Sequence, residues 1–297
     1  MIIRLASAPD LAAVQRVCAD ALDLDPDASD LPAILARSEG HFGVVAEAGG
    51  EIVGACYGSL RSDAGGEASG HVDLLAVAPQ ASGRGLGASL LSGMEELLAE
   101  RGAAAVVLAG NPPVYLWPGV DARYTAMTCL ATQAGYERYA EAVDMAVHLA
   151  ATDLECGPDT DRLAASGVTV RRAERAESER LVGWLRAGPW GQSTWPDEAA
   201  ATLTHQPAGC HVACRGDQYV GFACHAAVRR GWFGPMGTLS PERRHGIGSV
   251  LLRRCLSDMQ AGGLEVARIG WVGPVRFYAR AVGARTERVY WLYRKVL

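Results

Sequence analysis

Two glycine-rich turns, each between an apolar strand and an apolar helix, carry the residues best suited to chemistry in this 297-residue chain. The first is the run LAVAPQASGRGLGASLL from Leu75 to Leu91, and the second is LSPERRHGIGSVLL from Leu239 to Leu252. A helix N-terminus offers unpaired main-chain N–H groups, and glycine lets an anion approach them closely. Arg243, Arg244 and His245 add side-chain donors to the second turn. Both turns therefore predict a phosphate site.

Two residues near these turns have the chemistry to move protons. Asp73 lies in the strand HVDLLAV, where a carboxylate can accept a proton, although strand alternation also allows an outward, solvated side chain. Tyr278 lies in FYARAVGA, and its phenol, with an ordinary pKa near 10, can donate a proton. The alternative for Tyr278 is a ring that only packs against the sheet.

The two turns belong to an internal repeat of the whole chain. Arg4 and Arg171 lie 167 residues apart, as do Gly54 and Gly221, whereas Pro79 and Pro241 lie 162 apart and Gly87 and Gly248 lie 161 apart. A constant offset that shortens within one hairpin loop indicates two copies of one fold. We expect one domain over residues 1–150, a connector over 151–167 and a second domain over 168–297.

Each copy shows the same order of elements. In the first copy a strand IIRLA precedes a helix over 9–22, a short helix over 31–38, and two strands joined by Gly49-Gly50, a hairpin signal. The strand HVDLLAV, the turn and its helix, a buried strand AAAVVLAG, a helix over 125–134 and a final strand pair follow. This order predicts, in each copy, a mixed and mostly antiparallel sheet flanked by helices, of the α/β or α+β class.

The motif Arg243-x-x-Gly246-x-Gly248 after a strand resembles the pyrophosphate signature Q/R-x-x-G-x-G/A of the GNAT superfamily of acyl-CoA N-acyltransferases. The element order, present twice, is similar to the GNAT fold across nearly all of the chain. Tandem members such as mycothiol synthase share this two-copy architecture, and the resemblance implies no particular substrate.

The resemblance implies acetyl-CoA as the acyl donor and assigns roles to residues of both copies. Tyr278 corresponds to the general acid for the thiolate, one residue farther from its glycine than is common, and Asp73 to a carboxylate that helps deprotonate the amine. The first copy departs from the pattern, because Ser82 replaces the usual arginine and Ala131 the acid tyrosine, and the second has Pro235 near the position of Asp73. The implied cofactor-binding residues are Leu239, Arg243, Arg244, His245, Gly246, Ile247, Gly248 and Ser249, with Val77, Gly83, Arg84, Gly85, Leu86, Gly87 and Ala88 in the first copy.

The expected function is therefore acetyl transfer to a primary amine of a small molecule, with the second copy as the catalytic half. The alternative is a sensor or pseudoenzyme in which one or both halves bind acyl-CoA without catalysis. The acidic loop LDLDPDASD either attracts a cationic amine or is merely solvated. Trp190 and Trp195 in the second copy either cover a ring-shaped acceptor or pack in the core.

Composition and motifs exclude several other classes. A net charge of −5 argues against a nucleic-acid partner, and no apolar run predicts a membrane span or a secretion signal. Eight cysteines among apolar neighbours suggest reduced thiols in the cytoplasm, and strand alternation disfavours a metal site at Cys210, His211 and Cys214, so no metal is expected. Gly83-x-Gly85-x-x-Ala88 fits a dinucleotide fingerprint but follows four strands and lacks the later acid. We expect a monomer or homodimer.

Overall fold

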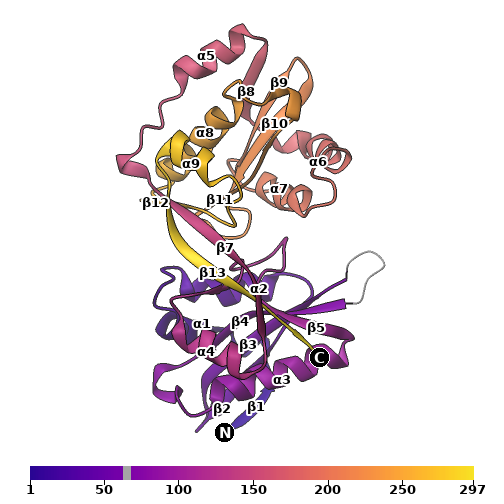
Figure 1. Cartoon of the computed structure of the whole chain (residues 1–297), viewed down its shortest axis with the longest axis vertical. Coiled ribbons are helices and arrows are strands. Elements are labelled where there is room, and N and C mark those ends of the chain that lie inside the picture. The colour runs from indigo at the N-terminus through magenta and orange to yellow at the C-terminus, as the bar shows by residue number, and fades with distance from the viewer. Residues whose placement is uncertain (63–67) are drawn as a thin grey trace. The chain divides into compact units, whose positions relative to one another are not determined.

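The computed structural model describes residues 1–62 and 68–297, and its chain divides into two compact units. The N-terminal unit comprises Met1–Ala142 and Val289–Leu297, and the C-terminal unit comprises Val143–Arg288. Each unit holds a mixed sheet with helices on both faces (Figure 1). The predicted fold class is confirmed.

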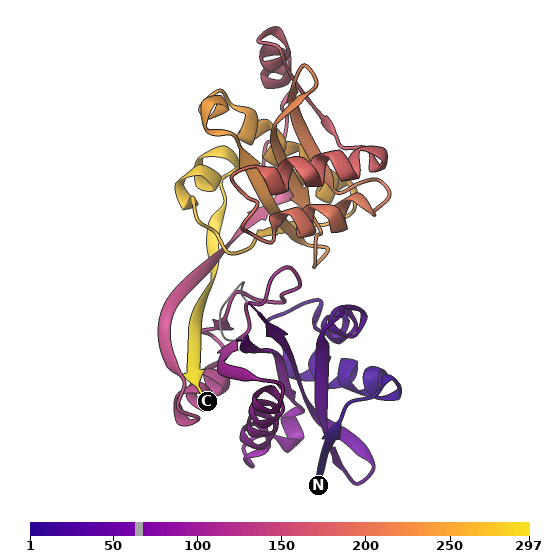
Figure 2. The same ribbon diagram turned by 90° about the vertical axis from the view of Figure 1, so that its right-hand side faces the viewer.

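The N-terminal unit builds its sheet in the order β1-β2-β3-β4-β5-β13, in which β4 and β5 are parallel and the other pairs are antiparallel. Helices α1 and α2 pack on one face, and α3 and α4 on the other (Figure 2). The elements are β1 (Ile2–Leu5), α1 (Leu11–Ala21), α2 (Leu31–Arg37), β2 (His41–Ala48), β3 (Glu51–Arg61), β4 (Ala68–Val77), α3 (Leu86–Glu100), β5 (Ala103–Leu108), β6 (Val120–Asp121), α4 (Thr125–Gln133) and β7 (Glu137–His148).

The C-terminal unit repeats this plan with strand order β8-β9-β10-β11-β12-β7. Helices α6 and α7 enclose one apolar cluster, and α5, α8 and α9 pack over the other face. The elements are α5 (Gly157–Ala165), β8 (Val168–Arg172), α6 (Ser178–Ala187), α7 (Trp195–Leu203), β9 (Cys210–Arg215), β10 (Gln218–His225), β11 (Trp232–Thr238), α8 (Ile247–Ala261), β12 (Val266–Ile269), α9 (Val275–Val282) and β13 (Arg285–Val296).

The helices that follow the two turns form for the same reason. In α3 the residues Leu86, Leu90, Met94 and Leu98 recur at every fourth position and are buried against the sheet. A repeat of this period places all four side chains on one helical face. In α8 the buried residues Ile247, Val250, Leu251, Leu252, Cys255, Leu256 and Met259 form the corresponding apolar face.

The last strand of the chain completes the first unit instead of the second. Residues Arg294–Val296 of β13 pair antiparallel with β5, and residues 145–148 of β7 pair with β12. The yellow C-terminal strand in Figure 1 therefore ends beside the N-terminal unit's own sheet. The units accordingly differ from the contiguous boundaries that the sequence suggested, because each sheet takes its final strand from a segment that the repeat assigns to the other copy.

The segment expected to be a plain connector, 151–167, contains helix α5. Pro158 lies in the first turn of this helix, where its missing N–H costs no hydrogen bond, and Asp159 lies near the positive end of the helix dipole. Leu163 is buried in the core beneath α8. One buried residue in nine is too weak a periodic signal to reveal the helix from the sequence.

The C-terminal residues should be essential to the stability of the N-terminal unit. Tyr290 is fully buried there, so Tyr290→Ala should lower the free energy of unfolding by about 3–5 kcal/mol, the usual cost of removing a large aromatic core side chain. Val289, which is 41% exposed, is the matched control, and Val289→Ala should cost less than about 0.5 kcal/mol. Urea denaturation followed by circular dichroism measures both, and equal midpoints for the two variants would contradict the assignment of β13 to this core.

Candidate functional site

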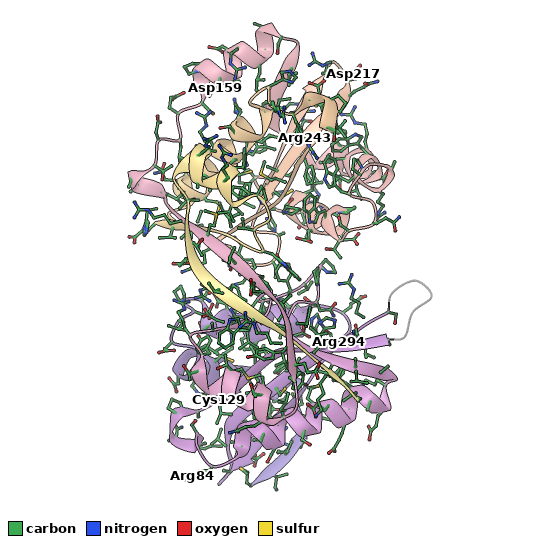
Figure 3. All side chains as sticks on the ribbon, in the orientation of Figure 1. Arg84, Cys129, Asp159, Asp217, Arg243 and Arg294 are labelled. Carbon is green, nitrogen blue, oxygen red and sulfur yellow. The ribbon has the colours of Figure 1, made fainter. Side chains whose placement is uncertain are left out.

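The turn of the N-terminal unit is open to solvent and shaped for an anion. Gly83 and Gly85 have φ of 75° and 80°, a left-handed conformation that glycine adopts without strain. Gly85 is the N-cap of α3, and a Cβ on either glycine would meet no atom within 4 Å. Arg84 between them is exposed (Figure 3). The first N–H groups of α3 can therefore be approached closely by a phosphate.

Strands β4 and β5 diverge beside this turn. Their parallel ladder runs from Ala68 to Val72 on β4 and ends where Val72 pairs with Leu108. One further main-chain bond follows, from Ala109 N–H to Val72 C=O at 2.8 Å. Residues Leu74–Val77 continue to pair with β3, whereas Asp73–Val77 have no partner strand on the β5 side among the described residues. This half of β4 offers free main-chain donors and acceptors to a ligand.

A cavity of about 580 Å³ fills the space between the diverging strands and reaches the turn. This volume is within the usual range of small-molecule sites, roughly 300–1,000 Å³. Apart from the turn glycines, its wall includes Leu22 of the α1–α2 loop, Asp73, Leu75 and Val77 of β4, Trp117, Asp121, Arg123, Tyr124 and Leu130. The predicted cofactor residues Val77, Gly83, Gly85, Leu86, Gly87 and Ala88 and the predicted base Asp73 all line this cavity.

Asp73 lies at a β-bulge where the two strands begin to diverge. Tyr57 pairs with Leu74 and Gly58 pairs with Val72, so Asp73 has no counterpart on β3. Its side chain is therefore not the outward, solvated residue that plain alternation allowed: Asp73 is 2% exposed. Bulges are known to re-aim side chains beside active sites.

The Asp73 carboxyl group is held by one hydrogen bond. Ser59 Oγ donates to Oδ2 at 2.6 Å, and Asn111 Nδ2 donates to Ser59 Oγ at 2.7 Å. Oδ1 has no hydrogen-bond partner among the described residues. Burial disfavours the charged form and raises the pKa of Asp73 to about 8. Asp73 therefore titrates in the range in which a general base for an amine is useful.

Tyr124 provides a phenol on the cavity wall at the N-terminus of α4. Its hydroxyl donates to Asp25 Oδ2 at 3.1 Å, and Trp117 Nε1 donates to the other oxygen of the same carboxylate at 3.2 Å. Asp25 is only 4% exposed, so this aspartate of the acidic loop ties the loop to the cavity wall instead of being solvated. Ala131, at the position of the absent tyrosine, is fully buried.

The second turn has the same backbone as the first. Ser82 and Arg243 both have φ −69° and ψ 159°, Gly83 and Arg244 are both left-handed, and Gly246, like Gly85, is a left-handed N-cap. All of these pairs lie 161 residues apart. In this register Leu239 matches Ala78 and lies one residue past β11, and Gly234 rather than Pro235 takes the position of Asp73.

The C-terminal turn is covered where the N-terminal turn is open. Nη2 of Arg162, from α5, lies 2.7 Å from the position that a Cβ on Gly246 would take, and Nη1 donates to His245 C=O at 3.1 Å. The side chains of Arg243, Arg244 and His245 are exposed (Figure 3 labels Arg243). A phosphate on this turn would have to displace or contact the Arg162 guanidinium.

Aromatic side chains fill the acceptor side of the C-terminal unit. A Cβ on Gly237 of β11 would collide with the indole of Trp190, and Trp190 lies 5.3 Å from Trp184 and 5.2 Å from Phe222 between ring centroids. Trp195 stacks on Trp190 at 6.4 Å. The geometry supports core packing for both predicted tryptophans.

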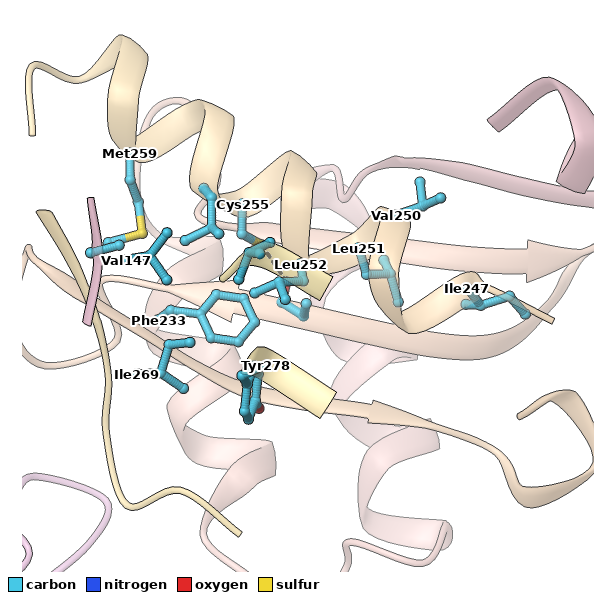
Figure 4. Packing of buried hydrophobic residues seen from close by; sticks show 14 of the residues in the cluster. Val147, Phe233, Ile247, Val250, Leu251, Leu252, Cys255, Met259, Ile269 and Tyr278 are labelled. Carbon is cyan, nitrogen blue, oxygen red and sulfur yellow. Dashed lines mark hydrogen bonds between the residues drawn. The ribbon is translucent and has the colours of Figure 1, made fainter. Parts of the chain in front are cut away.

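Tyr278 also packs in the core. It is 7% exposed, and Figure 4 shows its ring beside that of Phe233, at a centroid distance of 6.1 Å. The ring of Phe277 lies at a centroid distance of 5.0 Å. Burial raises its pKa above the ordinary value. The C-terminal unit has a glycine at the position of Asp73, and the Arg162 guanidinium lies over its turn.

Several residues of the site were not identified from the sequence. His41, Ser59 and Asn111 lie far from Asp73 along the chain and reach it only through the strand register, so no local motif could have indicated them. Tyr124 carried one usable signal, its position directly before a helix facing the turn. Within the described ranges, no group of three or more His, Cys, Asp or Glu side chains is placed to hold a metal ion, and no helix has the length and apolar character of a membrane span.

The sequence profile described as the acetyltransferase (GNAT) family matches residues 9–115 and 168–284. A mycothiol acetyltransferase from Geodermatophilus obscurus is 30% identical over 179 residues, which are 57% of this chain and 52% of that protein. The match therefore spans about half the length of this curated relative.

Solved structures resemble the whole chain in fold. A glucosamine N-acetyltransferase region of a fungal multi-domain β-N-acetylglucosaminidase has a TM-score of 0.80 at 20% identity, covering 99% of this chain and 38% of that one. A tandem GNAT protein from the clavulanic acid biosynthesis pathway has a TM-score of 0.69 at 15% identity and covers 99% of this chain and 98% of its own. At these identities the likeness concerns the fold. With the profile matched in both copies, the chain belongs to the acetyltransferase (GNAT) family and contains its fold twice.

Proposed function

We propose that this protein transfers an acetyl group from acetyl-CoA to a primary amine of a small molecule, and that the reaction takes place in the cavity of the N-terminal unit. The observation that carries the proposal is the position of Asp73. Asp73 lines a cavity that also holds an unpaired strand edge and an open phosphate turn, and one of its buried carboxyl oxygens has no hydrogen-bond partner among the described residues. These are the three elements that acyl transfer from a thioester to an amine requires.

The N-terminal cavity fits the acyl donor. The N–H groups at the start of α3 and the glycines Gly83, Gly85 and Gly87 suit the pyrophosphate. The free edge of Asp73–Val77 suits the amides of the pantetheine arm, and its N–H groups suit the oxygen of the thioester. The donor supplies an activated acetyl group, and the chain's own groups bind and orient it.

Asp73 is the proposed base for the amine. A carboxyl group with a pKa of about 8 is a stronger proton acceptor, once ionised, than a solvated carboxylate. In this cavity the phenol of Tyr124, rather than that of Tyr278, lies on the wall and is the candidate to stabilise the departing sulfur. Tyr278 is proposed to have a packing role.

A second candidate function concerns the C-terminal unit alone. The position of Arg162 over Gly246 and the packing of Trp190 against Gly237 favour a unit that does not catalyse transfer. Its exposed Arg243, Arg244 and His245 still suit a phosphate, so binding of acyl-CoA without turnover is the alternative for this half.

The cellular setting is a proposal as well. All eight cysteines are free thiols, which fits a reducing compartment such as the cytoplasm. We propose a monomer or homodimer that acts on a soluble amine without a nucleic-acid or membrane partner, in line with the negative net charge of −5.

Replacement of Asp73 by asparagine should remove the base and keep the shape of the site. Because a positioned general base contributes roughly 10²–10⁴ in rate, Asp73→Asn should lower kcat by at least about 100-fold with little change in the KM for acetyl-CoA. In the wild type, kcat/KM should rise with pH through about 8, where the Asp73 carboxyl ionises. Thiol release measured from pH 6 to 10 tests this, with Tyr278→Phe as the control that should retain turnover within about twofold.

The two turns allow a matched test of which unit binds the donor for catalysis. Gly85 and Gly246 have the same left-handed conformation, so replacing either glycine by alanine costs about 1–2 kcal/mol of backbone strain. Gly85→Ala also places a methyl group over the phosphate cradle and should raise the KM for acetyl-CoA at least about tenfold, whereas Gly246→Ala should leave it within about twofold. The opposite pattern would move catalysis to the C-terminal unit.

Asp73 should also make stability depend on pH. Its pKa is raised from 3.8 to about 8 in the folded protein, so between these values the unfolded chain binds fewer protons and stability falls as pH rises. Asp73→Asn removes this loss and should be more stable than the wild type by about 1–3 kcal/mol at pH 9, the cost of one unsatisfied buried polar group. At pH 4 the two proteins should unfold at similar urea concentrations, and a variant that is less stable at pH 9 would show that Asp73 is not desolvated.

A further inference from the structure

Three polar side chains form a row across strands β2, β3 and β4 next to Asp73. His41 pairs with Ser59, and Ser59 pairs with His71 on the other side. Directly paired residues in neighbouring strands place their side chains on the same face of a sheet. The row thus leads from Ser59, which donates a hydrogen bond to Asp73, to His41 at the start of β2.

His41 and Asp73 are two titratable groups with buried side chains that lie beside each other. His41 Nε2 lies 3.7 Å from Asp73 Oδ2, and the two side chains are 6% and 1% exposed. Neither ring nitrogen of His41 reaches a hydrogen-bond partner in the described part of the chain, and neither does Oδ1 of Asp73. Such unsatisfied buried groups cost stability, and they tend to occur where function requires them.

In the described part of the chain, the other groups around His41 and Asp73 do not form an ion pair with either residue. Ser59 and Asn111 supply hydrogen bonds to the Asp73 side, and His71 Nδ1 is bound to Ala109 C=O at 2.9 Å. The Cys56 thiol is fully buried, and its pKa is raised by desolvation and by the nearby acids Asp73 and Glu95. On the far side of His41 the carbonyl groups of Ser38 and Glu39 favour a proton on the ring, while burial opposes it and lowers its pKa.

We propose that His41 is a positioning residue that shares a proton with Asp73, so that it sets the ionisation of this base and takes over the proton that the base removes from the acceptor amine. This inference rests on the proposed function of the N-terminal cavity. Nothing in the motif resemblance points to His41, which the strand register alone brings to Asp73.

The proton balance of the step is complete without another reactant. As the amine nitrogen bonds to the acetyl carbon, one N–H proton passes to the Asp73 carboxylate. When the 3.7 Å separation closes to hydrogen-bond length, the proton passes to His41 Nε2 and leaves a carboxylate and an imidazolium, a transient state because burial lowers the pKa of His41. Once the product has left, the proton returns to the Asp73 carboxyl group and from there passes to water in the cavity. The electron pair of the broken C–S bond leaves with the sulfur, which takes up the second proton of the original ammonium group.

The test measures the pair directly and also through turnover. The full-length protein, labelled with ¹³C at the aspartate carboxyl carbons, is titrated by NMR as wild type, His41→Gln and His148→Gln, with Asp73→Asn assigning the signal. His148 is an exposed histidine of the C-terminal unit and serves as the matched control. Because His41→Gln removes the carboxylate–imidazolium state, the titration midpoint of Asp73 should move up by at least about half a pH unit. His148→Gln should leave it unchanged.

Kinetics of the same variants complete the experiment. His41→Gln should lower kcat about 3- to 30-fold at pH 7, shift the rise of kcat/KM to higher pH and leave the KM for acetyl-CoA unchanged. A purely structural histidine would lower the melting temperature without moving either pH midpoint, and that result would overturn the proposal. If His41→Gln does not fold, His41→Asn is tested in the same way. If the wild type acetylates no amine, the proposed function fails, while the NMR titration still decides whether the two groups share a proton.

Discussion

The divergence of β4 from β5 after Val72 is the constraint on which the rest of the N-terminal unit depends. A sheet normally satisfies every main-chain group of an inner strand, so five residues of β4 without a partner on one side are costly unless a ligand or water pairs with them. The bulge at Asp73, the cavity and the approach to the turn all follow from this divergence. β13 supports this divergence, because it pairs with β5 on the side away from β4.

Burial of Asp73 lowers the stability of the folded protein and, in the function that we propose, makes its carboxylate a better base. A carboxyl group with one hydrogen bond and a buried unpaired oxygen is destabilising when charged, which is the reason that its pKa rises to about 8. The same desolvation makes the ionised form a more effective base. In the C-terminal unit Gly234 takes this position, so that unit has no buried carboxylate there, and Trp190 and Arg162 lie against Gly237 and Gly246.

Local signals in the sequence were sufficient for the fold and for the turns. Glycines at fixed spacing before an apolar helix require a left-handed backbone, and both Gly85 and Gly246 adopt it. The internal repeat gave the element order except at the end of the first copy, where the expected strand pair is the single strand β7 and the expected connector contains α5. Features set by long-range pairing were not predictable in this way: the exchange of β13, the helix α5 over Gly246, and the approach of His41 and Ser59 to Asp73 each depend on contacts between residues distant in the chain. Tyr278 has a suitable residue type, yet the core encloses it.

The most direct test of the central claim is a crystal structure of the full chain with a non-hydrolysable acetyl-CoA analogue. The account predicts the pyrophosphate on the N–H groups of residues 83–88, the pantetheine arm along Asp73–Val77 and the acetyl group beside the Asp73 carboxyl group. Density for the analogue only at the turn of Arg243–Gly248, or outside the cavity between β4 and β5, would contradict it.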